Sequence, residues 1–190
     1  MSRLTDNNIL IPALWVAFFT FASGLVISLG LESLITKTKD LVLSFLSLGL
    51  VIFSGIVSDA IGTAAAAADM VPFNAMAAKK IPRANQAVRI VRNADLVANL
   101  TADVVGDIAG TLSGAIGAAI VFTLSDRFSI LNTVLLGATM TSLIAAVTVG
   151  GKTIGKSIAI NNANSIILKV AGVMMWWEDL TGIELLRGRR

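Results

Sequence analysis

Residues 128–151, FSILNTVLLGATMTSLIAAVTVGG, decide the fold because no charged side chain interrupts them. A helix rises about 1.5 Å per residue, so about 20 apolar residues cross the roughly 30 Å hydrocarbon core of a bilayer. The stretch meets that length and is therefore predicted to span a membrane.

Three more apolar runs precede this stretch, at residues 9–31, 41–68 and 96–125. Only Asp126 and Arg127 separate the run 96–125 from residues 128–151, which predicts a tight helical hairpin. The first run begins like a signal peptide, but it exceeds an apolar signal segment in length and no convincing small-residue cleavage site follows. We therefore predict four retained spans in one transmembrane domain covering residues 1–190.

The composition supports an all-α integral membrane protein and excludes several chemistries. Of the 190 residues, 55% are hydrophobic and 14% charged, and there is no cysteine or histidine. Disulfides, thiolate or imidazole metal sites and Ser-His-Asp hydrolysis are therefore excluded, and a metal would need oxygen ligands, as Mg²⁺ or Ca²⁺ does. An enzyme is not expected, because no clustered acid at the interface replaces the missing histidine and cysteine.

Basic residues predict the orientation, because cytoplasmic loops carry an excess of Lys and Arg. The segment after the second span and the tail after the fourth hold most of them: Lys79, Lys80, Arg83, Arg89, Arg92, Lys152, Lys156, Lys169, Arg187, Arg189 and Arg190. We expect both termini in the cytoplasm and the chain in the plasma (inner) membrane. This topology explains the basic charge without nucleic acid binding.

Two segments outside the spans have helical apolar periodicity. Residues 73–92 are predicted to form a basic juxtamembrane helix that Pro82 interrupts or starts, and residues 164–186 an amphipathic interfacial helix. Trp176 and Trp177 are typical of an aromatic belt at the bilayer surface. For the basic segment we favour attraction to anionic lipid at the cytoplasmic face over a specific partner.

Three carboxylates, Asp59, Asp103 and Asp107, fall within the spans. Facing lipid they would together cost about 8 to 10 kcal/mol, so they are expected to point into the bundle. Asp103 and Asp107 are four residues apart and share a helix face, as do Ser54 and Ser58 beside Asp59. Together these residues predict an all-oxygen site of the kind that Mg²⁺ accepts.

Small residues and lysines surround the predicted site. Gly106, Gly110 and Gly114 form overlapping small-xxx-small motifs, which predict close helix approach. Lys152 and Lys156 follow the fourth span, and each aspartate could instead pair with one of them in a purely structural role. The charges of the three aspartates sum to −3. Including Lys152 gives a net charge of −2, which a divalent ion balances, and including Lys156 as well gives −1.

Four short motifs resemble the transmembrane domain of the cyclin-M/CorC magnesium transporter family. That family has a Ser-x-Ser-Glu-like motif, an Asn-Pro-Asp-like turn, an Asn-x-x-x-Asn pair and a closing Gly-Glu-x-x-Pro-Lys. The counterparts, in the same order and over about residues 45–175, are residues 54–59 (SGIVSD), 93–95 (NAD), Asp103-x-x-x-Asp107 and 151–156 (GKTIGK). Aspartates stand where the family has both asparagines, Lys152 replaces its acid, and Gly155 its proline.

The resemblance implies a homodimer that transports Mg²⁺ or another hard cation through an intramembrane site open to the cytoplasm. Ligand positions carried over are Ser54 or Ser58 with Asp103 and Asp107, and we add Asp59, with Lys152 and Lys156 modulating the charge. We expect no nucleotide-binding CBS pair, because few residues follow the last span. The alternative is a non-transporting structural or regulatory membrane subunit with a Lys–Asp paired core.

Overall fold

The computed structural model describes residues 7–38, 40–128 and 132–186, and helices account for nearly all of them. No strand occurs within these ranges. The elements are α1 (Asn7–Thr38), α2 (Leu41–Ala67), α3 (Met70–Ala78), α4 (Ala84–Arg92), α5 (Ala94–Ala98), the π-helix η1 (Asn99–Val105), α6 (Gly106–Arg127), α7 (Thr133–Asn161) and α8 (Ala163–Thr181).

Four helical segments in the described ranges are long and apolar enough to cross a membrane: Ala13–Gly30 within α1, α2, the continuous run Ala94–Arg127, and α7. This confirms the predicted all-α membrane protein. The third segment combines α5, η1 and α6, so that one crossing contains a π-helical turn.

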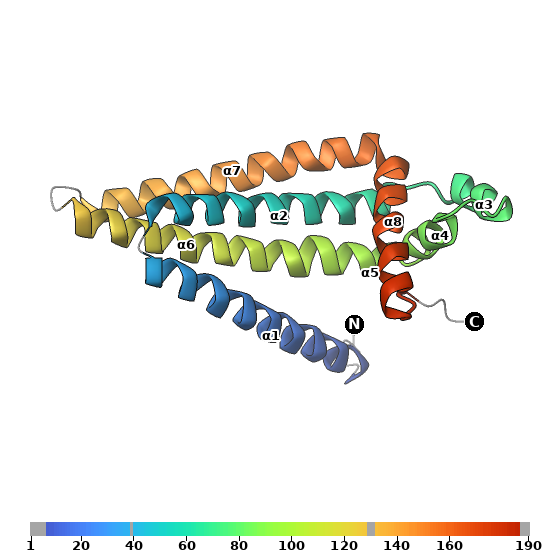
Figure 1. Cartoon of the computed structure of the whole chain (residues 1–190), viewed down its shortest axis with the longest axis horizontal. Coiled ribbons are helices and arrows are strands. Elements are labelled where there is room, and N and C mark those ends of the chain that lie inside the picture. Colours follow the sequence, from blue (N-terminus) through green and yellow to red (C-terminus); the bar gives the residue numbers. More distant parts are fainter. Residues whose placement is uncertain (1–6, 39, 129–131, 187–190) are drawn as a thin grey trace, which may run out of the picture.

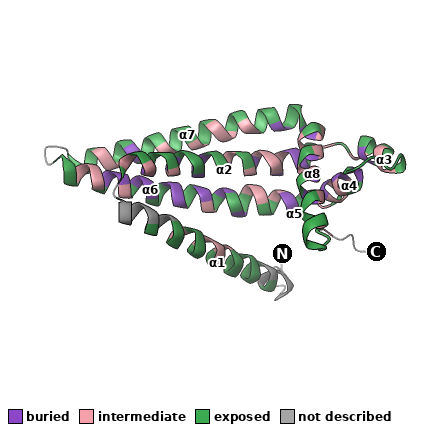
Figure 2. Cartoon of the chain, in the orientation of Figure 1, coloured by how far each residue is buried: buried purple, intermediate pink, exposed green. Residues whose placement is uncertain are grey.

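Helices α2, α6 and α7 lie side by side along the length of the molecule, whereas α1 diverges from them (Figure 1). Apolar residues of α2 such as Leu48 and Ile52 share a buried cluster with Leu112 and Ile116 of α6. Figure 2 shows most of the coloured residues of α1 as exposed, and no residue of its apolar window Ala13–Gly30 is buried. A bilayer supplies the apolar surroundings that this helix lacks within the chain.

Small residues of α2 and α7 determine how closely the bundle packs. A Cβ built on Gly55 of α2 would lie 2.9 Å from the Cβ of Ala109 on α6. Gly155 of α7 faces Ile56, whose Cγ2 would lie 3.2 Å from such a Cβ. By contrast, a Cβ on Gly110 or Gly114 would meet nothing within 4 Å, so the predicted glycine row of α6 does not make the close approach.

The basic segment forms two helices where residues 73–92 were predicted as one helical segment. Helix α3 ends at Ala78 and α4 begins at Ala84, and Pro82 lies in the turn between them. Proline lacks an N–H group and cannot continue a helix, which explains the break. Two residues of the turn, Lys80 and Arg83, have positive φ angles of 55° and 72°.

Helix α8 lies crosswise at the end of the bundle and packs against α4 (Figure 1). The Glu178 carboxylate of α8 accepts hydrogen bonds from Arg89 Nη2 (2.7 Å) and Gln86 Nε2 (3.1 Å) of α4. The backbone N–H of Leu185 donates to its other oxygen at 2.9 Å. These bonds fix the juxtamembrane helix on the C-terminal helix.

Three predicted boundaries need correction. Helix α6 includes Asp126 and Arg127, and the connection to α7 lies at residues 128–132, of which 129–131 are outside the described residues. Helix α7 continues to Asn161 instead of ending near 151, because Lys152 and Lys156 end the apolar run without ending the helix. Helix α8 ends at Thr181 instead of 186, since Gly182 takes the left-handed conformation that terminates helices (φ 67°).

Candidate intramembrane polar site

Asp59 is a buried carboxylate in the second half of α2, with 3% of its surface exposed. Its Oδ2 lies 3.5 Å from the Nζ of Lys156 on α7, and it has no hydrogen-bond partner within the described residues. Half of the Lys156 side chain is exposed (52%). The buried Oδ2 is therefore held only by the charge of Lys156, without a hydrogen bond, and a competing cation would have to take the place of that ammonium.

The π-helix η1 faces α2 at the level of Asp59. A π-helical turn bonds each N–H to a carbonyl five residues back and is frequently found at functional sites. The hydroxyl of Ser58 donates to the carbonyl of Thr101 in η1 at 2.7 Å. A Cβ on Gly62 would lie 2.7 Å from Thr101 Oγ1 and 3.2 Å from the Cα of Ala98, so only glycine fits there unchanged. We call Ser58, Asp59, Gly62, Thr101 and Lys156 the inner seam.

Asp103 and Asp107 lie on a different face of the third span, Ala94–Arg127, and both are exposed. Asp103 Oδ2 accepts a hydrogen bond of 3.2 Å from Asn99 Nδ2. Gly110 and Gly114 continue this face and are also exposed. We call Asp103, Asp107, Gly110 and Gly114 the outer row.

The side chain of Lys152, on α7, lies against the third span at a point between Asp103 and Asp107. A Cβ built on Gly106 would lie 3.3 Å from Lys152 Nζ. Gly106 stands between Asp103 and Asp107 in the chain, but Lys152 forms no ion pair within the described ranges. The ammonium group is thus close to the backbone that carries both acids.

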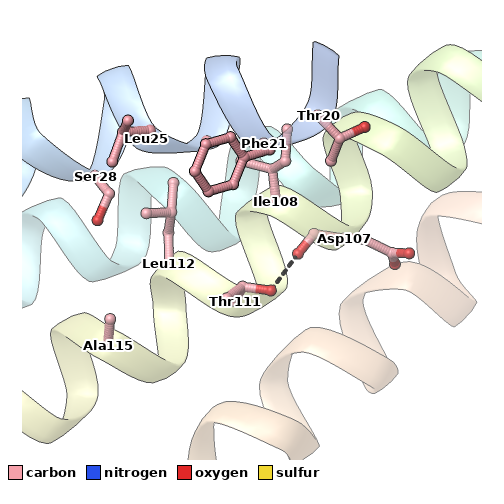
Figure 3. A pocket seen from close by; sticks show the side chains of 10 residues that line it. Thr20, Phe21, Leu25, Ser28, Asp107, Ile108, Thr111, Leu112 and Ala115 are labelled. Carbon is pink, nitrogen blue, oxygen red and sulfur yellow. Dashed lines mark hydrogen bonds between the residues drawn. The ribbon is translucent and has the colours of Figure 1, made fainter. Parts of the chain in front are cut away.

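A groove of about 370 Å³ separates α1 from α6 (Figure 3). Phe21 and Leu25 of α1 face Ile108 and Leu112 of α6 across it. The carboxylate of Asp107 projects away from these apolar side chains, at the edge of the groove. The groove is therefore apolar, and the acid belongs to the outer row.

The structure separates the predicted site residues into two groups. Ser58 and Asp59 lie in the inner seam, and Asp103 and Asp107 lie in the outer row. Ser54 is exposed and donates to the carbonyl of Val51 in its own helix at 2.8 Å. Within residues 7–38, 40–128 and 132–186 no three acidic side chains gather closely enough to hold a metal ion.

The sequence interpretation missed Thr101 and Asn99. Thr101 supplies a backbone carbonyl, and Asn99 donates to Asp103. A π-helical turn changes the helical period by one residue in a short segment, which apolar periodicity does not resolve. The only sequence signal is a polar residue, Asn99, one turn before Asp103.

Comparisons with protein families, curated proteins and solved structures find no match to the chain. The fold and the polar residues define an all-α membrane protein whose spans hold a buried carboxylate paired with a half-exposed ammonium and two exposed aspartates.

Proposed function

We propose that the protein transports Mg²⁺ or another hard cation across the membrane, with Asp59 of the inner seam as the principal ligand. One observation carries the proposal: the Oδ2 of the buried intramembrane carboxylate Asp59 accepts no hydrogen bond within the described residues and is held only by the half-exposed Lys156, next to Ser58, which bonds a π-helical turn. Charged side chains and irregular backbone at membrane depth are characteristic of ion pathways and cavity linings.

The oxygen atoms of the inner seam suit a hard cation. Mg²⁺ is commonly bound through one or two carboxylates and keeps several water molecules, so Asp59 does not need two acidic neighbours. The Ser58 hydroxyl and the Thr101 carbonyl, 2.7 Å apart, add neutral oxygens beside it. Asp103 and Asp107 would attract the cation on the outer row, with Lys152 moderating their charge.

Lys156 would compete with the transported cation. Its ammonium lies 3.5 Å from Asp59 and is half exposed, so it can leave the carboxylate without itself being trapped in the core. An arriving divalent ion would replace one positive charge with two. The pair then serves as the resting state of the site.

Ion flux into liposomes that contain the full chain tests this proposal, with Mg²⁺, Ca²⁺ and Na⁺ supplied one at a time. Asp59→Asn should lower Mg²⁺ flux at least tenfold, and Asp103→Asn and Asp107→Asn should lower it less. Asp179→Asn, an exposed acid of α8, is the matched control and should leave flux unchanged. Unchanged flux in the three span variants would contradict the proposal.

The second candidate is a non-transporting structural or regulatory subunit, and the Lys156–Asp59 ion pair favours it. In this case the pair only specifies how α2 and α7 pack. A purified chain that carries no flux with any ion, and whose Asp59→Asn/Lys156→Met double variant folds as well as the parent, would support the subunit.

For the assembly we propose a homodimer that covers the outer row. Exposed aspartates at membrane depth are costly in contact with acyl chains, and Gly110 and Gly114 leave room beside them. Because the chain has no cysteine, Gly110→Cys introduces a unique thiol. It should form a disulfide between two copies in liposomes, whereas Val134→Cys, exposed at the start of α7, should not.

For the orientation we propose that the end carrying α3, α4 and α8 faces the cytoplasm of a cell whose plasma membrane holds the chain. This end holds Lys79, Lys80, Arg83 and Lys169, and the start of α1 points toward it as well (Figure 1). Labelling of an Asp179→Cys thiol from each side of intact cells or vesicles tests the orientation.

A further inference from the structure

Helix α8 has an apolar face that no described part of the chain covers. Its buried residues, among them Ile167 and Met174, pack on the bundle. The opposite side presents Val173, Trp176, Trp177 and Leu180, which are 66%, 60%, 48% and 64% exposed. These positions are three or four residues apart and form one stripe along the helix. Because α8 lies crosswise to the spans, the stripe runs across the end of the bundle (Figure 1).

Arg83 lies beside this stripe in a strained backbone conformation. Its φ angle is 72°, in the left-handed region that is unfavourable for residues with a Cβ. Its side chain crosses α8 at Gly172, where a Cβ would lie 3.2 Å from Arg83 Cδ and 3.3 Å from Nε. Gly172 precedes Trp176 by one helical turn, so Arg83 contacts α8 one turn before the first indole of the stripe.

The guanidinium group of Arg83 has no hydrogen bond or ion pair within the part of the chain that the structure describes. Lys79 and Lys80 in the same turn are exposed, as is Lys169, one turn before Val173 on α8. Of the two acids of α8, Glu178 is occupied by Arg89, and only Asp179 is exposed. The stripe is therefore bordered by positive charge.

We infer that the α8 stripe and Arg83 form a docking surface for anionic phospholipid headgroups, with Arg83 binding the phosphate. Trp side chains prefer the headgroup layer, and a basic border adds attraction to an anionic leaflet. A guanidinium group is also well suited to a phosphate, to which it can donate two hydrogen bonds. The inference does not depend on transport activity, since it concerns only the end of the bundle.

Fluorescence quenching by brominated lipids tests this inference on the full chain in liposomes. Trp15→Phe leaves Trp176 and Trp177 as the only indoles. Brominated phosphatidylglycerol, titrated into a phosphatidylcholine bilayer, should quench them more strongly than brominated phosphatidylcholine at the same mole fraction. In that background, Arg83→Gln should lower the fitted relative affinity for phosphatidylglycerol about fivefold, and Arg83→Lys should restore part of it.

Arg92→Gln is the matched control, since it removes the same charge at the other end of α4. It should leave the preference for phosphatidylglycerol unchanged. Equal quenching by both lipids would overturn the inference, because the stripe would then have no preference for an anionic headgroup. Absence of quenching by either lipid would also overturn it and would indicate that a protein or a second copy covers the stripe. An Arg83→Gln variant that keeps the full preference, or loss of the preference when phosphate replaces chloride at equal ionic strength, would also overturn it.

Discussion

The inner seam and the outer row contain similar residues but differ in burial. Both combine aspartates with glycine, and both have a lysine of α7 nearby. In the inner seam Asp59 is 3% exposed and pairs with Lys156, whereas Asp103 and Asp107 in the outer row are exposed. Lys152 lies close to the outer row without pairing. Helix α2 thus holds a buried carboxylate with a counter-charge, and the neighbouring span holds two exposed carboxylates without an ion pair among the described residues.

The glycines of α2 account for this difference. Gly55 and Gly62 let α6 and η1 approach the face of α2 that carries Asp59, so this face becomes the interior. A Cβ on either glycine of the outer row would meet no described atom within 4 Å, so this face is open. A small residue brings helices together only where the facing side chains complement it.

Removal of Lys156 should have the largest effect on stability. Lys156→Met leaves the buried carboxylate of Asp59 without a counter-charge, which should lower the free energy of unfolding by about 2 kcal/mol, less than for a fully buried pair because Lys156 is half exposed. Thermal unfolding in detergent, followed by circular dichroism, measures this change. Asp59→Asn in the same chain should recover most of it, and Lys152→Met should change little. If Lys156→Met and Lys152→Met lower the free energy of unfolding equally, the inner seam and the outer row do not differ in how strongly their lysines stabilise the fold.

The second-largest difference in stability is expected between alanine substitutions at Gly62 of the inner seam and Gly110 of the outer row. Gly62→Ala pushes η1 away from α2 and should cost about 1 to 2 kcal/mol, because the new Cβ meets Thr101 Oγ1 and the backbone of Ala98. Within one copy of the chain Gly110→Ala enters open space, so in a detergent-solubilised monomer it should be neutral or slightly stabilising, since alanine favours a helix. Melting temperatures in detergent compare the two. A larger loss at Gly110 would show that the outer row is packed in solution.

Much of the fold followed from the sequence, because length and hydropathy are nearly sufficient for membrane spans. The predicted run 41–68 and the observed α2, Leu41–Ala67, differ by one residue. The end of α7 was misplaced by ten residues because hydropathy reports where lipid contact ends and not where a helix ends. The break at Pro82 followed from proline chemistry.

The grouping of the site residues did not follow from the sequence. Periodicity places Asp103 and Asp107 on one face, and it cannot say whether that face meets α2 or the surroundings. The π-helical turn shifts the helical register between Asn99 and Val105, just before Asp107. The sequence left open whether an aspartate of the spans pairs with Lys152 or Lys156. In the structure Asp59 pairs with Lys156.

A smaller difference in stability is expected between alanine substitutions of Ser58, in the inner seam, and Ser54, elsewhere on α2. Ser58→Ala removes the donor to the Thr101 carbonyl and should cost about 1 kcal/mol, close to the average for hydrogen bonds between membrane helices. Ser54→Ala removes only a bond to its own helix, at Val51, and should be close to neutral. The difference in melting temperature between the two variants is the readout. If Ser54→Ala destabilises as much as Ser58→Ala, Ser54 has a role that its own-helix bond does not explain.

Glu178 is the reference case of a carboxylate whose two oxygens both accept hydrogen bonds. The effect on stability expected from its substitution is the smallest of those predicted. Burial raises the pKa of its carboxyl, but hydrogen bonds from Gln86, Arg89 and the Leu185 N–H, together with the Arg89 charge, outweigh burial and lower the pKa below its ordinary 4.5. A lowered folded pKa means that the contribution to stability is complete above about pH 4.5 and is lost as the pH falls through the folded value. Unfolding measured from pH 7 to pH 3 should therefore show a loss that Glu178→Gln removes, while Asp179→Asn, without such donors, should retain it. A loss that persists unchanged in Glu178→Gln would contradict the assignment of this acid sensitivity to Glu178 and to the hydrogen bonds that lower its pKa.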